Sequence, residues 1–181
     1  VAGTRPRGRT PAEDEAYSRA LMDSEKDVRE HRFVVEALVA GFASLCGAVQ
    51  RGDDLALLRL PECQHLHRRI EGILAGPCSD AEILRVLHPT PAVGGHPKRE
   101  AAEWIGRLEP FDRGWYTGPV GWIGHDAAEF AVALRCGLAH GTAFSVYSGA
   151  GIVLGSTPQG EWDEIEEKMG NLAGVLGGDD R

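Results

Sequence analysis

The sequence predicts an α/β fold of the α+β type, in which antiparallel strands and helices share one domain. The strand candidates late in the chain follow one another across short turns, without the long crossovers that parallel strands need. Two capping-box patterns, at residues 10–13 and 79–82, indicate where helices begin. A chain of 181 residues is long enough to bury one core of ordinary size.

The first half of the chain alternates helical and strand patterns. Its expected elements are a helix, with a break, from residue 10 to about residue 46, strand material at 55–60 and 63–74, and a short helix from the second capping box to residue 87. Residues 88–95 contain two prolines and two glycines, so they predict a rigid loop without regular structure.

The second half begins with a helix and continues with strands. Its expected elements are a helix at 97–108, a hairpin of strands at 119–123 and 130–136, a strand at 143–148, a glycine-rich turn with a second short strand at 152–153, and a helix with Thr157 as its N-cap. The acidic end, residues 179–181, is expected to be disordered.

Composition excludes several classes of protein. The net charge of -8 argues against nucleic acid as a partner, and the arginines at positions 5, 7 and 9 fit an exposed arm. The four cysteines lack C-x-x-C spacing and indicate buried, reduced thiols. The longest apolar stretch, residues 33–49, is too short to span a bilayer, and no secretory signal opens the chain. We therefore expect a cytoplasmic protein without a membrane partner.

Several polar residues share a face of a predicted element. Glu161, Glu164 and Lys168 lie on one side of the last helix, near Gly149 and Gly151, whose backbone amides are free to meet an anion. This combination suits a small anionic ligand held partly by a hard metal ion. A solvated acidic helix after a loop would explain the same spacing.

The rest of the chain offers three more candidates, each with an ordinary alternative. Asp27 and Glu30 share a helix face, which is more often simply solvated. His65 and His67 share a strand face, and such a pair is more often hydrogen-bonded or exposed than bound to metal. In the second half, Arg135 is expected to lie on a strand beside small alanines, where a guanidinium can bind a carboxylate; a surface cross-strand charge is the alternative.

Four segments together resemble the chorismate-utilising enzymes, which include isochorismate, salicylate, anthranilate and aminodeoxychorismate synthases. Residues 147–153 with 161–168 resemble the C-terminal signature of that family, residues 24–31 its Glu-Lys-Asp-x-x-Glu-His motif, and residues 64–66 its Gln-His-Leu. Residues 3–5, Gly-Thr-Arg, resemble a segment that follows a whole N-terminal half. The resemblance implies that residues 1–181 are the C-terminal half of the chorismate-binding (anthranilate synthase component I-like) fold, with antiparallel sheets layered against helices.

The resemblance also implies a site for chorismate and magnesium (Mg2+). It makes Glu30 and Glu164 direct metal ligands, Glu161 a ligand through water, and Asp27 a further member of the metal site. The implied substrate-binding residues are Gly3, Thr4, His65, Ala92, Tyr116, Arg135, Gly149, Gly151 and Lys168. The general base and the general acid of the family lie upstream of the Gly-Thr-Arg segment, so this chain is expected to be inactive without that half.

Within the family, residues 88–92 resemble the His-Pro-Thr-Pro-Ala segment of isochorismate synthases, whereas salicylate- and anthranilate-forming relatives tend to carry threonine at the place of Ala92. The expected activity is isomerisation of chorismate to isochorismate, feeding menaquinone, siderophore or salicylate-type biosynthesis. The alternatives are a salicylate or anthranilate synthase-like enzyme, or a non-catalytic truncated module that binds chorismate or magnesium. The expected partner is the missing N-terminal half, and apolar surface left bare without it predicts a dimer or poor solubility.

Overall fold

The computed structural model describes residues 1–52 and 55–176, with the side chains of 171–176 excepted. The expected disorder of the acidic end lies outside the described residues. The chain divides into two compact units, Val1–Trp104 and Ile105–Arg181. Every strand pair within the described residues is antiparallel, which confirms the α+β class.

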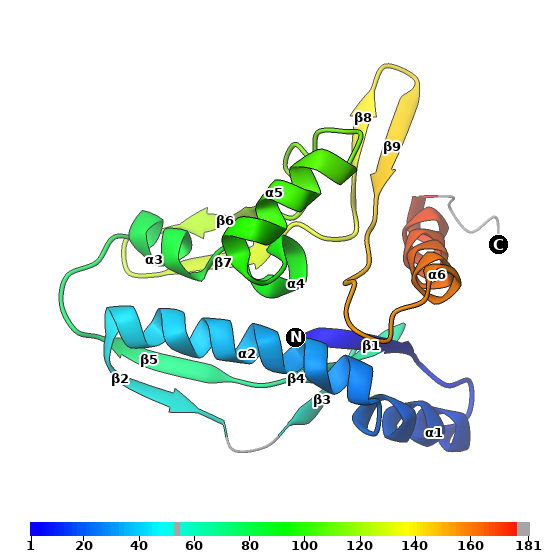
Figure 1. The fold of residues 1–181 in the computed structure, drawn as a ribbon, viewed down its shortest axis with the longest axis horizontal. Helices are drawn as coiled ribbons and strands as arrows, with labels where there is room; N and C mark the ends of the chain where they lie inside the picture. The colour runs from blue at the N-terminus through cyan, green and yellow to red at the C-terminus, as the bar shows by residue number, and fades with distance from the viewer. Residues whose placement is uncertain (53–54, 177–181) are drawn as a thin grey trace. The chain divides into compact units, whose positions relative to one another are not determined.

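The first unit packs helices on two small sheets (Figure 1). Its elements are β1 (Ala2–Pro6), α1 (Pro11–Met22), α2 (Glu25–Leu45), β2 (Cys46–Arg51), β3 (Ala56–Arg59), β4 (Cys63–His67), β5 (Ile70–Leu74), α3 (Asp80–Leu87), α4 (Pro91–Gly94) and the start of α5 (Lys98–Leu108). One sheet has the order β1-β4-β3 and the other pairs β2 with β5. Helix α2 lies against strands of both sheets. The buried hydrophobic side chains in the described part of the chain are Ala2, Leu21, Val34, Val35 and Leu66.

The helix starts follow their capping residues. The Thr10 hydroxyl accepts from the Glu13 amide, the Glu13 carboxylate accepts from the Thr10 amide, and Ser79 and Glu82 repeat this arrangement. The expected long helix is broken between α1 and α2, where Ser24 caps the new helix. One expectation was wrong. The loop at residues 88–95 contains the helical turn α4, because a proline at the first helical position favours the helical φ and needs no backbone donor.

Strand β1 was not anticipated, and Gly3 explains how it fits. Gly3 has a φ of +75°, and the register of β1 on β4 shifts between Ala2 and Thr4. A Cβ on Gly3 would lie 3.1 Å from the Asp27 Cβ, so the backbone of β1 approaches α2 closely at this bulge. The strand therefore depends on a glycine at this position.

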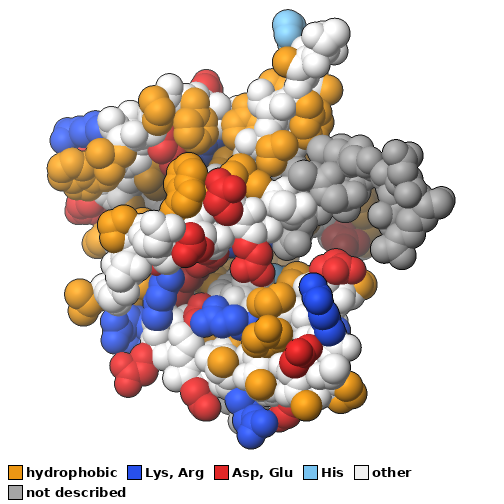
Figure 2. Space-filling model, turned by 90° about the vertical axis from the view of Figure 1, so that its right-hand side faces the viewer, with side chains coloured by type: hydrophobic (Ala, Val, Ile, Leu, Met, Phe, Trp, Pro, Cys, Tyr) orange, Lys and Arg blue, Asp and Glu red, His pale blue; other side chains and the backbone are white. Residues whose placement is uncertain are grey.

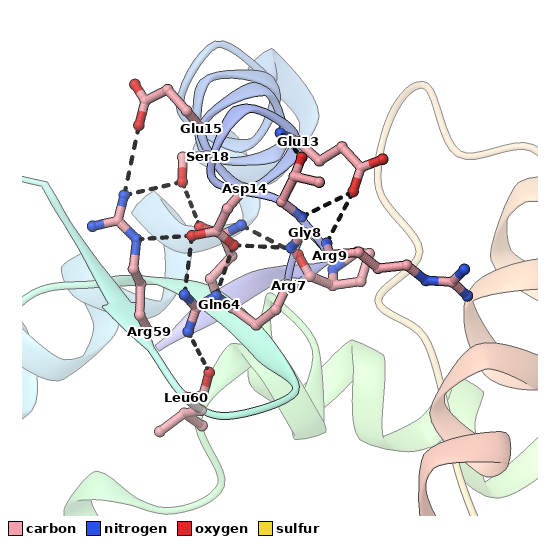
Figure 3. A network of polar contacts seen from close by, with 12 residues as sticks. Arg7, Gly8, Arg9, Glu13, Asp14, Glu15, Ser18, Arg59, Leu60 and Gln64 are labelled. Carbon is pink, nitrogen blue, oxygen red and sulfur yellow. Dashed lines mark hydrogen bonds and ion pairs between the residues drawn. The ribbon is translucent and has the colours of Figure 1, made fainter.

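A network of polar contacts joins the end of β1 to α1 and β3 (Figure 3). The Arg7 guanidinium donates to both carboxylate oxygens of Asp14, at 2.7 and 3.0 Å, and the Gly8 amide donates to the same carboxylate. Arg59, from β3, lies 3.8 Å from Asp14. The bond to Arg7, followed by that to Gly8, lowers the pKa of Asp14 from its ordinary value of 3.8 to about 2.

This lowered pKa predicts a pH-dependent contribution of Asp14 to stability. Because the folded carboxyl holds its proton less tightly than the unfolded one, its stabilisation is fully present above about pH 4 and is lost as the pH falls toward 2. The urea midpoint of the wild type should therefore exceed that of Asp14→Asn at pH 6, and the difference should close by about pH 2. Asp23→Asn, at an exposed carboxylate, is the control; an equal gap for Asp14→Asn at both pH values would contradict the account.

The second unit consists of hairpins and one long helix. Its elements are the end of α5, β6 (Pro119–Ile123), β7 (Ala128–Val132), β8 (Cys136–His140), β9 (Ala143–Tyr147) and α6 (Pro158–Leu176). In the described residues β6 pairs with β7, β8 pairs with β9, and α6 contacts β9. The short strand expected at 152–153 is not formed; these residues lead into a turn at 154–155, and the Val153 amide donates to Ser156 Oγ.

The strand expected at 130–136 is also corrected, because it ends before Arg135. Strand β7 ends at Val132, and Arg135 has a φ of 50° in the turn that leads into β8. The Leu134 amide donates to the Val132 carbonyl, so the chain has already left the extended conformation there. Arg135 is exposed in this turn rather than on the face of a sheet.

Apolar side chains are exposed on the hairpins, as expected for part of a larger domain. Along β6, Val120, Trp122 and Ile123 are 58%, 52% and 64% exposed. Hydrophobic side chains are also visible among charged ones on the face in Figure 2. The four cysteines, all within the described residues, form no disulfide and are only half-buried, which corrects the expectation of buried thiols. Among the described helices, none combines the length and apolar character needed to cross a membrane.

Candidate functional site

The predicted site residues fall into two groups, one in each unit. The first unit contains Gly3, Thr4, Asp27, Glu30, His65 and Ala92. The second contains Tyr116, Arg135, Gly149, Gly151, Glu161, Glu164 and Lys168. Each group is described within its own unit.

His65 is the centre of the first group. It lies on β4, on the face opposite the fully buried Gln64, because side chains alternate along a strand. Its Nδ1 lies 3.0 Å from the Thr4 hydroxyl and 3.3 Å from the Gly3 carbonyl oxygen. Its Nε2 lies 3.2 Å from the sulfur of Cys63, two residues earlier on the same face. The bulged strand β1 therefore brings the predicted residues Gly3 and Thr4 against the predicted histidine.

Asp27 is buried at the start of α2 and already has a cationic partner. The Arg5 guanidinium donates to Asp27 Oδ2 at 2.8 Å and to the Thr4 carbonyl at 2.7 Å. This ion pair joins α2 to β1 beside His65. Glu30, one turn further along α2, is half-exposed.

His31 follows Glu30 and is almost completely buried. Desolvation by burial, aided by the charge of Arg68, lowers the pKa of His31 to about 4. The imidazole is therefore neutral near pH 7. Ala92 lies in α4 and is half-buried.

Lys168 connects the second group. Its ammonium donates to the Gly149 carbonyl at 3.0 Å and to Glu164 at 2.5 Å, one helical turn away on α6. The same contact holds the glycine-rich segment after β9 against the helix. Glu161 is buried one turn earlier on α6, and Gly151 is half-buried in the segment.

Tyr116 lies beside this segment. A Cβ on Gly149 would be 3.0 Å from the Tyr116 hydroxyl, so the absence of a side chain there makes room for the phenol. The ring stacks on Tyr147, with centroids 5.5 Å apart. Burial raises the pKa of Tyr116, and the nearby charges of Arg113 and Arg135 oppose that shift. The unit thus brings together a phenol, a guanidinium and an ammonium, which are groups that bind carboxylates.

In the described part of the chain, no three His, Cys, Asp or Glu side chains gather as a metal-binding group. The candidate carboxylates have the hard oxygen ligands that magnesium prefers. Asp27 and Glu164 each have a cationic partner in the structure.

Three contacting residues were not among the predicted site residues. The contact of Cys63 with His65 could have been predicted from strand alternation, because the two residues share a face of β4. Arg5 is adjacent to Thr4, but nothing in the sequence links it to Asp27, 22 residues away. Tyr147, at the end of β9, stacks on Tyr116 in the turn before β6, and no local pattern indicates that contact.

Comparison with known proteins gives a consistent result. The family described as chorismate binding enzyme matches residues 1–177. Isochorismate synthase MenF of Bacillus subtilis is 38% identical over 100% of this chain and 39% of its own length. Anthranilate synthase component 1 of Aeropyrum pernix is 37% identical over 99% of this chain and 42% of its own length.

A solved structure agrees in fold. The putative 2,3-dihydroxybenzoate-specific isochorismate synthase DhbC of Bacillus anthracis is 37% identical, with a TM-score of 0.90 over 97% of this chain and 48% of that one. The chain therefore spans about two fifths to one half of the length of these relatives. The resemblance read from the four sequence segments is confirmed, and the chain belongs to the chorismate binding enzyme family.

Proposed function

We propose that this chain supplies the C-terminal half of a magnesium-dependent isochorismate synthase, which converts chorismate to isochorismate when joined to an N-terminal half. The observation that carries the proposal is the similarity to isochorismate synthases along nearly the whole chain, in sequence and in fold. The chain covers only 39% and 48% of the length of these two relatives, which supports the need for a second half.

The second unit supplies groups for a substrate carboxylate. In the proposal, Arg135 and Tyr116 bind one carboxylate of chorismate, since a guanidinium and a phenol both donate hydrogen bonds. Gly149 and Gly151 offer backbone amides. Lys168 holds the carbonyl of Gly149 at 3.0 Å, which keeps the glycine segment on α6 and its amides in place.

By resemblance to the family, Glu30 and Glu164 would hold the magnesium ion, with Glu161 acting through water. Asp27 is better suited to a supporting role, because Arg5 already neutralises its carboxylate. When bound, magnesium would offset the negative charge of the substrate carboxylate. Glu164 would exchange part of its contact with Lys168 for this role.

The reaction adds water at C2 of the ring while the hydroxyl at C4 leaves. Such an exchange needs one group to remove a proton from water and another to protonate the leaving hydroxyl. Resemblance puts both groups in the upstream half. His65, held by Thr4 and Gly3, would face the substrate and orient it.

Reassembly tests the proposal. The chain is mixed with the upstream half of the Bacillus subtilis relative, chorismate and magnesium, and the products are separated by chromatography. Formation of isochorismate only in the presence of both halves and magnesium is expected. Light scattering first establishes that the two halves form a complex. If this complex makes no isochorismate, the result counts against the proposal.

The exposed hairpins are the proposed contact for the missing half. Strand β6 is exposed along its whole length, and two-stranded sheets are only marginally stable alone. Without the other half, this apolar surface favours association of the chain with itself. Light scattering of the chain alone should then report a dimer or larger species, whereas a monodisperse monomer would contradict this part of the proposal.

The similarity to an anthranilate synthase component favours one alternative, an enzyme that releases pyruvate. In our proposal, residue 92 decides between isochorismate formation and pyruvate release. A threonine hydroxyl there can orient or relay a proton during pyruvate loss, and the methyl group of Ala92 cannot. In the reassembled enzyme, Ala92→Thr should therefore release pyruvate above the wild-type background, measured with a coupled lactate dehydrogenase assay. Ala92→Ser supplies a hydroxyl on a smaller side chain, and Ala92→Val is the matched control without a hydroxyl. Equal pyruvate release by Ala92→Thr and Ala92→Val would contradict the assignment.

A second alternative is a binding module without turnover. The chain alone carries the carboxylate-binding groups of the second unit, so it can retain affinity for chorismate. Calorimetric titration of the chain with chorismate, together with absence of product after reassembly, would favour this alternative.

A further inference from the structure

Gln64 is a fully buried polar residue next to the candidate histidine, and the proposed function does not use it. It lies on β4 with its side chain on the core face, whereas His65 points to the opposite face. Leu66, the next residue on the core face, is equally buried. A carboxamide in such a place costs free energy unless both its ends are hydrogen-bonded.

Both ends of the Gln64 carboxamide have partners (Figure 3). The Ser18 hydroxyl, on α1, donates to Gln64 Oε1 at 2.6 Å, and Gln64 Nε2 donates to the Pro6 carbonyl at 3.2 Å. Ser18 in turn accepts from Arg59 Nη2 at 3.1 Å. Gln64 therefore joins α1, β1 and β4 at one point.

The bond from Gln64 adds a tie at Pro6, a residue of β1 that has no backbone N–H. Proline has no N–H, so β1 cannot donate to β4 at the position where Pro6 faces Cys63. The side chain of Gln64 binds the carbonyl of this residue. The contact between Arg7 and Asp14 holds the chain just beyond Pro6, where the Arg7 amide also donates to the Glu62 carbonyl at 3.1 Å. Side chains and backbone together therefore fix the end of β1.

The other end of β1 determines the state of His65. The Gly3 oxygen is a carbonyl and can only accept, so the bond that His65 Nδ1 donates to it requires the proton on Nδ1. The Thr4 hydroxyl shares that proton. Nε2 then carries the lone pair, and the Cys63 thiol lies 3.2 Å from it. The partner of one ring nitrogen thus sets the protonation of the other.

We propose that Gln64 is a positioning residue: by holding β1 on β4 through Pro6 and Ser18, it keeps Gly3 and Thr4 against His65 and fixes the Nδ1–H tautomer. This inference rests on the proposed function only in that His65 is taken to face the substrate. Gln64 thus controls the register of β1 on β4, in addition to filling space in the core.

The test is ¹⁵N NMR of the histidine rings in the whole chain at one pH. The shifts of the two ring nitrogens report which of them carries the proton, and His65→Gln identifies the signals of His65 among the seven histidines. The wild type should show the Nδ1–H tautomer. Gln64→Met keeps the size and removes both hydrogen bonds, so Nδ1–H should no longer be the dominant form.

Leu66→Met is the matched control, since it puts methionine on the same face of the same strand and leaves the network untouched. It should keep the wild-type tautomer; a shift equal to that of Gln64→Met would overturn the proposal. If Gln64→Met fails to fold, Gln64→Glu retains the acceptor for Ser18 but, when ionised, cannot donate to Pro6. It should lose the dominant Nδ1–H form as well, and an unchanged tautomer in a folded variant would overturn the proposal. Because no turnover is measured, this result is independent of the reassembly experiment.

Discussion

Replacing Glu164 by glutamine is expected to lower kcat/KM of the reassembled enzyme about 100-fold or more. The amide has nearly the shape of the carboxylate but no charge, so it binds a hard cation poorly. It also removes the ion pair with Lys168, whose ammonium lies 2.5 Å from Glu164 and 3.0 Å from the Gly149 carbonyl. Both the metal and the glycine segment should be affected.

The measurement is initial-rate kinetics over a range of magnesium concentrations. The variant should need a higher magnesium concentration for half-maximal rate. Glu167→Gln removes an exposed charge from the same helix and should change kcat/KM less than about threefold, as for surface substitutions. Loss of activity with an unchanged magnesium requirement would contradict a role of Glu164 as a magnesium ligand. It would leave the contact with Lys168 as the reason for the loss.

Replacing Leu21 by alanine is expected to lower the free energy of unfolding of the chain by about 3 kcal/mol. Leu21, at the end of α1, is fully buried, and a Cβ on Gly3 would lie 3.4 Å from its Cδ1. The truncation leaves a cavity beside the bulge of β1, where few other apolar side chains can close it.

Urea unfolding followed by circular dichroism measures this effect. Ile73→Ala is the control in the same unit, because Ile73 is 74% exposed, and it should cost less than about 1 kcal/mol. Equal losses for the two variants would mean that the small core around Leu21 does not dominate the stability of the chain.

The helices were predictable because their ends depend on neighbouring residues. Thr10 and Glu13 bond each other's amides three positions apart, and Ser79 and Glu82 do the same. The break between α1 and α2 follows from Ser24, which caps the second helix locally. Such signals need no knowledge of the rest of the fold.

The missed strands depend on distant partners. β1 pairs with β4, some 60 residues later, and its bulge exists because Gly3 meets Asp27 of α2. The periodicity around Arg135 suggested a continuous strand, yet its φ of 50° redirects the chain into β8. Alternation of side chains cannot show where a strand stops, because the pattern continues through the turn.

The candidate site was predictable only in part for the same reason. Motif resemblance identified Thr4 and His65, and the structure adds that they contact each other. The ties that hold them, from Arg5 to Asp27 and from Gln64 to Ser18, join residues 22 and 46 positions apart. These partners are set by packing rather than by any local pattern.

The central claim is that this chain is one half of an isochorismate synthase and lacks the proton-transfer pair. Its most direct test is incubation of the purified chain with chorismate and magnesium, with and without an upstream half, and chromatography of the products. We expect no turnover by the chain alone, and isochorismate without pyruvate once the upstream half is added. Isochorismate formed by the chain alone would contradict the account of the missing residues, and pyruvate from the reassembled pair would contradict the assigned reaction.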